Sequence, residues 1–197
     1  MVIARLFTFA LLLGSLLGVP TPVILASVPP MQVAQSVWRR HVSQAGGFSI
    51  LFPGTPQTLQ RTVPITDAIA ETVTMLYVFR EQESSMYAVA YNDFNFIEEE
   101  TVSPDVIEAS LNSGRDGMLK SNRATLLSER KISLGDYPGR EIRFRQADGW
   151  VGKARFYFVN KRLYQVLTLV DSKVERNLTK SIDGFLASFQ LLTESEQ

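Results

Sequence analysis

The sequence predicts an α+β fold in which an antiparallel β-sheet is flanked by helices. Short segments with alternating apolar residues are separated by turn-forming pairs such as Pro53-Gly54 and Asn160-Lys161, which is typical of strands joined by hairpins. A helix start stands in the middle of the chain at Ser103-Pro104, and the last part of the chain is an amphipathic helix. We therefore expect a single domain over residues 37–192, followed by a short tail over 193–197.

The first half of the domain is predicted to consist of strands. Segments 37–42 and 48–52 are joined by a loop that ends in two glycines, a pattern that favours an N-terminal hairpin. Pro53-Gly54 then turns the chain. Further strands are predicted over 57–63, 70–80 and 86–92, with a polar turn before the last of them.

The middle helix begins at Ser103, whose hydroxyl can accept a hydrogen bond from the first turn. Pro104 occupies the first helical position, where its missing N–H costs no hydrogen bond. The apolar stripe expected to face the core comprises Ile107, Leu111, Gly114 and Met118. The segment 125–134 separates this helix from the next predicted strands and has no element assigned to it.

Three more strands are predicted over 140–146, 150–159 and 162–170. Their first loop sets a register in which Gln146 pairs with Trp150. One face of this hairpin is then apolar, with Ile142, Phe144, Gly152, Ala154, Phe156 and Phe158. The other face is charged, with Glu141, Arg143, Arg145, Lys153 and Arg155. The next hairpin places Tyr157 beside Tyr164 on the charged face, so we expect another element to cover one end of it.

The C-terminal helix is expected to begin at Ser172, with Glu175 three residues later completing a capping box. Its predicted core stripe comprises Val174, Leu178, Ile182, Phe185 and Phe189.

Composition excludes several classes of function. The chain has 197 residues, with 20 Lys and Arg against 20 Asp and Glu, and this balance argues against a general nucleic-acid binder. It has no cysteine, which excludes disulfides, thiolate metal sites and cysteine nucleophiles. A single histidine, His41, stands beside Arg39 and Arg40 and has no evident partner for catalysis or metal binding. We expect no enzymatic activity, no cofactor and no bound metal.

The N-terminus predicts export. Arg5 precedes an uncharged apolar run over 6–19, as in a secretory signal peptide, and the run is too short to span a bilayer. We expect cleavage after Ala26, with 1–26 as the signal peptide and 27–36 as a flexible lead-in. A second candidate cut follows Ala34, and retention of the segment as an anchor is the alternative. Without a cysteine we expect no covalent lipid anchor, and a mature protein in the periplasm, the thylakoid lumen or the extracellular space.

Five phrases of the sequence carry a family resemblance: residues 47–56, 87–91, 137–141, 157–164 and 185–189. Together they resemble the PsbP-like family of small exported, mostly uncharacterised bacterial proteins common in cyanobacteria, over roughly residues 38–192. The resemblance implies an α/β/α sandwich built on an antiparallel sheet, with Gly54 and Gly139 in turns. PsbP itself is an extrinsic subunit of photosystem II, so the resemblance implies, by analogy of fold, a partner in a membrane-associated assembly.

Charge is segregated along the chain. Acidic residues dominate 81–116, where Asp93, Asp105 and the run 98–100 could coordinate a hard cation or form a solvated loop. Basic residues dominate 130–162. The two segments could neutralise each other, or one could be a docking surface. The candidate docking face comprises Arg143, Arg145, Lys153 and Arg155; the acidic segment 93–105 or an apolar groove is the alternative.

These observations predict a non-catalytic exported domain that docks on an extracytoplasmic protein or a membrane-associated complex. The alternative is a carrier of a small ligand or lipid, with a pocket between sheet and helix. Its motivation is a set of aromatic residues: Tyr77, Phe79, Tyr87, Tyr91, Phe156 and Phe158. A hydrolase without a recognisable motif is a third hypothesis.

Overall fold

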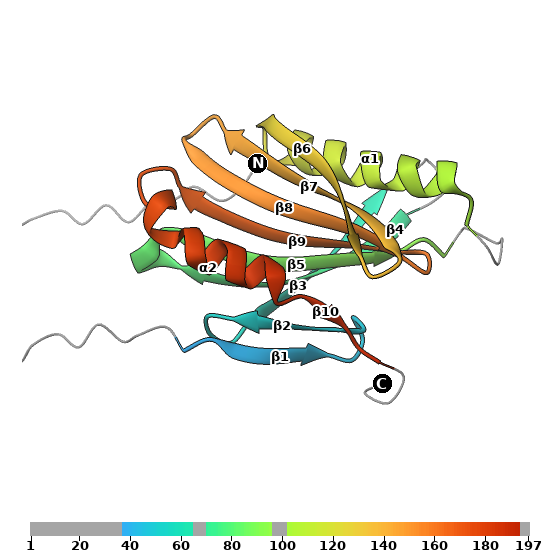
Figure 1. Ribbon diagram of the computed structural model, residues 1–197, viewed down its shortest axis with the longest axis horizontal. Coiled ribbons are helices and arrows are strands. Elements are labelled where there is room, and N and C mark those ends of the chain that lie inside the picture. Colours follow the sequence, from blue (N-terminus) through green and yellow to red (C-terminus); the bar gives the residue numbers. More distant parts are fainter. Residues whose placement is uncertain (1–36, 65–69, 96–101, 194–197) are drawn as a thin grey trace, which may run out of the picture. The chain divides into compact units, whose positions relative to one another are not determined.

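Seven antiparallel strands form the main sheet of the protein, in the order β3-β4-β5-β9-β8-β7-β6 (Figure 1). The computed structural model describes residues 37–64, 70–95 and 102–193. The strands are β3 (Gln57–Pro64), β4 (Ala70–Arg80), β5 (Ser85–Asp93), β6 (Ala124–Leu134), β7 (Tyr137–Gln146), β8 (Trp150–Val159) and β9 (Arg162–Asp171). The predicted signal peptide, the lead-in and residues 194–197 of the tail lie outside the described residues.

A second, smaller sheet contains the predicted N-terminal hairpin. Strand β1 (Arg39–Ser43) pairs with β2 (Phe48–Phe52), and β10 (Gln190–Leu191) pairs with the other edge of β2. The sequence predicts one sheet and no strand after the last helix. A two-residue strand has too little pattern to be recognised, and it forms here because Phe189 and Leu192 on either side of it are buried.

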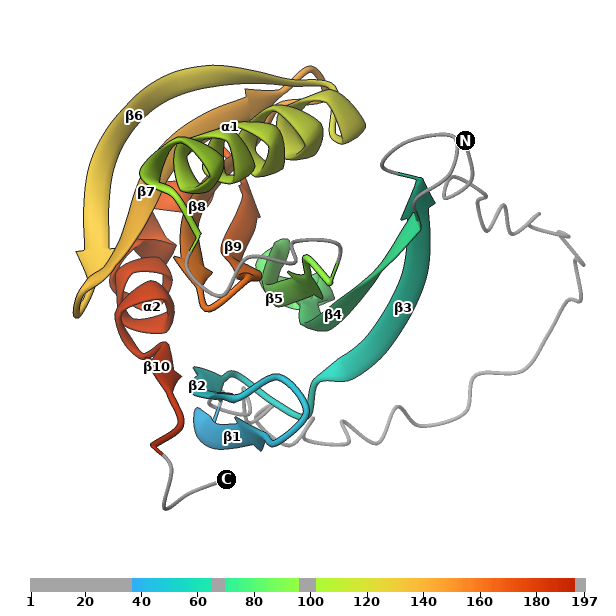
Figure 2. The same cartoon turned by 90° about the vertical axis from the view of Figure 1, so that its right-hand side faces the viewer.

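One helix packs on each face of the main sheet. Helix α1 (Pro104–Ser121) lies on β6, β7, β8 and β9, as Figure 2 shows, and α2 (Glu175–Ala187) packs on β8 and β9 from the opposite face. The predicted cap of α1 is confirmed, since the backbone N–H of Val106 donates to Ser103 Oγ. Among the described residues, no helix is long and apolar enough to cross a bilayer.

The predicted cap of α2 is wrong. The helix begins at Glu175, and no side chain caps it. The turn before it is organised by Asp171, whose Oδ1 accepts from the Lys173 N–H at 2.9 Å and whose carbonyl accepts from the Val174 N–H at 3.0 Å. Because Asp171 already closes this turn, Ser172 is not required as a cap.

The predicted register of the β7–β8 hairpin is confirmed. Ile142 pairs with Ala154 and Phe144 with Gly152, so the apolar side chains lie on the α1 face. The β8–β9 hairpin places Tyr157 opposite Tyr164, as expected. The element that covers part of the charged face is α2.

Strand β6 and Gly139 depart from the prediction. The segment 125–134, to which the prediction gave no element, is part of β6. The register of β6 shifts at a bulge between Leu126 and Ser128. This bulge breaks the alternation of side chains by which a strand is recognised. Gly139 lies inside β7 and not in a turn. Its lack of a side chain is needed there because a Cβ would stand 2.4 Å from the Phe156 carbonyl oxygen. The turn is formed instead at Gly135, which has φ 57°.

Two apolar clusters lie on opposite faces of the main sheet. Under α1 the cluster comprises Leu111, Ile142, Phe144, Ala154, Phe156, Phe158 and Leu163. The larger cluster joins the other face to α2 and the small sheet; its aromatic members include Phe48, Phe52, Tyr87, Tyr157, Phe185 and Phe189. Burial of this apolar surface holds the two sheets and α2 together.

Candidate functional site

The four residues of the predicted docking face lie on one face of the sheet. Arg143 pairs with Lys153 across β7 and β8, while Arg145 and Arg155 pair with neighbours whose side chains share that face. This is the face on which α2 packs. The prediction that these side chains gather on one side of a hairpin is confirmed; their role in docking stays a prediction.

Glu141 is the carboxylate around which part of this face is built. Its side chain is 8% exposed, and Arg155 Nε donates to Oε2 at 2.8 Å while Arg130 Nε donates to Oε1 at 2.9 Å. Lys153 Nζ lies 3.8 Å from Oε1. Burial alone would raise the pKa of this carboxyl, but the hydrogen bonds from Arg155 and Arg130 outweigh it and lower the pKa. The carboxylate therefore stays ionised and fixes the cations around it.

Helix α2 supplies partners for three of the predicted residues. Arg143 Nη2 lies 2.6 Å from Glu175 Oε1, and Lys153 Nζ lies 2.9 Å from Asp183 Oδ1. Arg155 also donates to a backbone carbonyl at the end of the helix, that of Leu186, at 3.0 Å. These contacts hold α2 in register on the sheet.

Cations outnumber carboxylates on this surface. On β6, β7, β8 and α2 it carries Arg130, Arg143, Arg145, Lys153, Arg155, Arg176 and Lys180 against Glu141, Glu175 and Asp183. We call this set of residues the basic surface. Each of its carboxylates is already bound to a cation of the set. The adjoining loops add Lys173, Asp148 and Asp171, so the positive excess remains.

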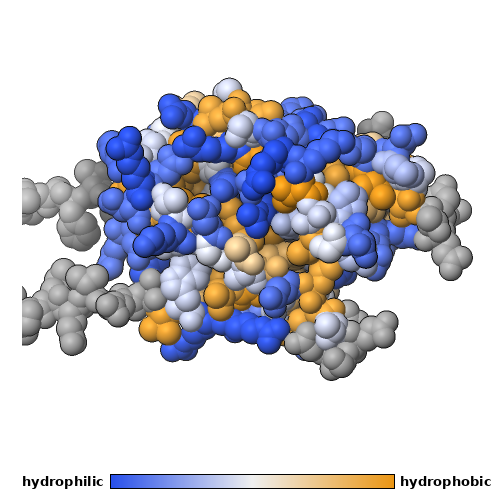
Figure 3. All heavy atoms as spheres, viewed as in Figure 1, coloured by the Kyte–Doolittle hydropathy of each residue, from blue (hydrophilic) through white to orange (hydrophobic). Residues whose placement is uncertain are grey.

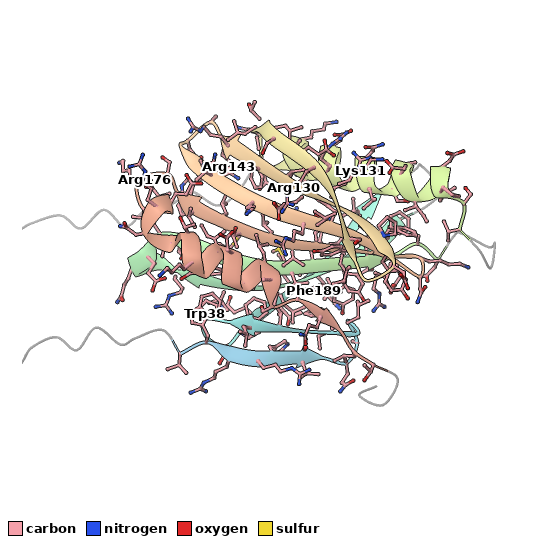
Figure 4. All side chains as sticks on the ribbon, in the orientation of Figure 1. Trp38, Arg130, Lys131, Arg143, Arg176 and Phe189 are labelled. Atoms are coloured by element: carbon pink, nitrogen blue, oxygen red, sulfur yellow. The ribbon has the colours of Figure 1, made fainter. Side chains whose placement is uncertain are left out.

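The excess charge is on exposed side chains. Arg145, Arg176 and Lys180 are exposed and have no ion pair within the described residues. Arg130 and Arg143 keep 63% and 47% of their side chains exposed despite their partners. Figure 4 labels Arg130, Arg143 and Arg176, which come from three different elements, and Figure 3 shows that the region over the first turns of α2 is hydrophilic. Arg176 and Lys180 were missed by the prediction, although their spacing of four residues places them on one side of a helix.

The α1 side of the protein is electrically balanced by comparison. Arg140 binds Glu108 and Glu129, and Arg115 binds Glu129 and Asp116. Lys131 completes the network on Glu108. Three cations thus meet three carboxylates. The acidic and basic segments of the chain neutralise each other here, as one of the two interpretations predicts.

The other predicted sites do not form a cluster. His41 lies on β1, at an edge of the small sheet, with its ring 6.0 Å from that of Phe52, and burial lowers its pKa. Asp93 forms an ion pair with Arg162, and Asp105 lies in the first turn of α1. Residues 98–100 lie outside the described part of the chain. Within that part no three acidic or histidine side chains are arranged to hold a metal ion.

The aromatic residues that motivate a carrier do not line one cavity. Tyr87 and Tyr91 belong to the cluster on the α2 face, whereas Phe156 and Phe158 belong to the cluster under α1. The sheet itself separates these two groups. Phe79 is 54% exposed.

Comparisons with known proteins show structural likenesses that are distant, among them the following two. No protein-family model matches the chain, and no curated protein matches it. The chain is similar to the solution structure of cyanobacterial PsbP from Synechocystis, with 11% identity, a TM-score of 0.43, and coverage of 85% of this chain and 98% of that chain. It is also similar to the crystal structure of the Ran-binding protein Mog1p from Saccharomyces cerevisiae, with 10% identity, a TM-score of 0.44, and coverage of 81% and 98%. Neither likeness assigns the chain to a family.

Proposed function

We propose that this protein is a non-catalytic docking domain that binds an acidic region of a protein partner through the basic surface. The observation that carries the proposal is the positive excess on that surface, where every carboxylate is already bound to a cation. The α1 side, with matched charges, provides no comparable attraction. A cationic surface of this kind steers and orients an acidic partner.

The residues of the basic surface divide into two roles. Lys153 and Arg155 are less than one-third exposed and hold Glu141 and α2 in place, so they position the surface. Arg143, Arg145 and Arg176 are exposed and make the contact. Guanidinium groups suit this task, because they bind carboxylates through two parallel hydrogen bonds and are weakly hydrated.

We also propose that the domain acts outside the cytoplasm, on a membrane-associated assembly. What supports this is the N-terminal pattern of Arg5 and the apolar run over 6–19, together with the phrases that resemble the PsbP-like family. A partner within photosystem II is the form that the analogy of fold suggests.

The docking proposal is tested with a defined acidic probe. The full chain is titrated into a fluorescein-labelled oligo-glutamate peptide, and binding is followed by fluorescence anisotropy at several salt concentrations. Arg145→Glu combined with Arg176→Glu should weaken binding about tenfold or more, because each reversal turns attraction into repulsion. The matched control is Arg39→Glu with Lys120→Glu, which changes net charge equally at exposed positions elsewhere.

The expected result is weaker binding by the first double variant alone, with the affinity of the parent chain falling steeply as salt rises. Equal weakening in both variants would mean that only net charge matters and would overturn the proposed surface. Anionic lipid vesicles form a separate arm. Tighter binding to vesicles than to the peptide would replace the protein partner with a membrane surface.

A further inference from the structure

The two edges of the main sheet differ in how they are protected. Strand β6 forms one edge and carries a bulge between Leu126 and Ser128. Its charged residues are fixed by ion pairs, Arg130 with Glu141 and Lys131 with Glu108. Bulges and charges are devices that prevent an edge strand from pairing with another chain.

Strand β3, at the other edge, is less protected: it has no bulge, and its one proline, Pro64, stands at its end. Its eight residues pair with β4 without any shift in register, and among the described strands only β4 pairs with it. Arg61 is the one charged residue of the strand. A regular edge of this length presents a row of backbone N–H and C=O groups to which a further strand can add.

One face of this edge carries exposed apolar side chains beside an exposed cation. Leu59 is opposite Met75, so their side chains share a face, and Phe79, four residues further along β4, lies on the same face. Leu59 is 45% exposed and Phe79 is 54% exposed. Arg61 lies on the same face two residues from Leu59, is exposed, and has no ion pair within the described residues.

We propose that β3 is a binding edge to which an extended segment of another protein adds as an antiparallel strand. An apolar side chain of the incoming strand lies opposite Leu59, and an acidic side chain lies opposite Arg61. In the antiparallel direction this requires the order acidic, any residue, apolar. Backbone hydrogen bonds supply the affinity, and the two alternate side chains supply the selectivity.

A second copy of this chain fits the edge less well. Two β3 strands paired around a two-fold axis would place two Arg61 side chains in one two-stranded ribbon, where their charges repel. Strand β3 contains no acidic residue to balance them. A partner strand with a carboxylate satisfies Arg61 directly. Charge complementarity therefore favours a different chain as the occupant.

The proposed edge is separate from the basic surface. Strand β3 is at one end of the strand order, whereas β6, β7 and β8 are at the other end. Substitutions at one of these surfaces should leave binding at the other unchanged, so failure of one proposal is distinguishable from failure of the other.

The experiment uses the full chain and a soluble ten-residue peptide with glutamate–threonine–valine at its centre in a threonine and serine background. Hydrogen–deuterium exchange should show new protection of backbone amides within residues 57–64 when the peptide is present. Anisotropy should show that Arg61→Glu weakens binding about fivefold, because an attractive cross-strand pair becomes repulsive. The same variant should bind a peptide with lysine in place of glutamate more tightly than the parent chain does.

Three controls sharpen the result. Arg145→Glu makes the same change of charge on the basic surface and should not alter protection of β3. Leu59→Thr keeps a residue that favours strands, so it should weaken binding of the peptide without changing the thermal stability of the protein. A peptide with proline in place of the central threonine loses a backbone donor and should bind more weakly.

Protection that maps to β6–β8, or an effect of Arg145→Glu equal to that of Arg61→Glu, would overturn the proposal. Sedimentation of the chain alone provides a further check. A concentration-dependent dimer in which residues 57–64 are already protected would assign the edge to a second copy and would likewise overturn it.

Discussion

At the scale of single residues, the basic surface depends on the buried carboxylate of Glu141. Its carboxylate accepts hydrogen bonds from Arg130 and Arg155, which come from strands on either side of β7. A neutral amide at this position would have similar size but would leave those guanidinium groups without their anion. The loss is costly for Arg155, whose side chain is only 21% exposed and has already given up much of its water.

We expect Glu141→Gln to lower the free energy of unfolding at neutral pH by about 1–3 kcal/mol. The pKa of Glu141 is lower in the folded chain than its ordinary value of 4.5, so its contribution is present above about pH 4.5 and is lost as pH falls through the folded pKa. The difference between variant and parent should be constant from pH 7 to pH 5 and shrink below that range. Urea unfolding across pH measures it.

Glu81→Gln provides the control, since Glu81 is exposed and has no ion pair within the described residues. A difference for Glu141→Gln that persists undiminished at pH 3 would show that the substitution acts through packing and not through charge.

Prediction of these residue roles from sequence was limited by distance along the chain. The register of a tight hairpin follows from local pattern, so the shared face of Arg143 and Lys153 was predictable. Their partners Glu175 and Asp183 lie on a helix some thirty residues later in the chain. Nothing in the local pattern indicates which strands that helix crosses, so the ion pairs were not predictable.

At the scale of elements, α1 contains a matched pair of glycines in different surroundings. A Cβ added at Gly114 would stand 2.6 Å from Leu163 Cδ2, whereas a Cβ at Gly117 would meet nothing within 4 Å. Leu163 is 2% exposed and cannot easily move aside. The first glycine permits close packing of helix and sheet; the second makes no such contact.

We expect Gly117→Ala to stabilise the protein by about 0.5–1 kcal/mol, because alanine restricts the unfolded chain and favours the helix. Gly114→Ala gains the same preference but crowds the core, which costs about 1–3 kcal/mol, so it should be destabilising overall. Chemical denaturation of both variants measures the difference. Equal stabilisation by both substitutions would mean that α1 stands farther from β9 than described.

The elements that sequence predicted well are those with strong local signals. Ser103 and Pro104 mark the start of α1, and Asn160 and Lys161 adopt the positive φ values that a tight hairpin turn requires. Strand β6 was not recognised because its bulge interrupts the alternation. Strand β10 was not recognised because two residues carry no periodicity.

At the scale of the whole molecule, the sequence predicted the α+β class and antiparallel pairing but not the division into two sheets. That division depends on the last described residues returning to β2, a contact between opposite ends of the domain. In the candidate site, too, features set by contacts distant in sequence were not predicted. Its face was predictable, while the contribution of Arg176 and Lys180 required knowledge of where α2 lies.

At this scale we also predict export, and we expect the mature N-terminus to lie between Ser27 and Gln35. The reason is the small residue that precedes each candidate cut, after a basic start and a short apolar run. N-terminal sequencing of protein isolated from its native host measures it. Intact Met1 in a membrane fraction would show instead that the segment is retained as an anchor.

The pairing of β10 with β2 also governs when the protein can finish folding. The N–H of Leu51 donates to Ser188 Oγ, 137 positions later in the chain, and Phe48 packs against Phe189. During synthesis the first hairpin emerges early but lacks its third strand and its aromatic neighbours Phe185 and Phe189 until residues 185–191 leave the ribosome. Contacts so distant in sequence slow folding. If the protein is exported as the N-terminal pattern predicts, this late completion would help keep the chain unfolded for a translocation channel, which accepts unfolded polypeptide.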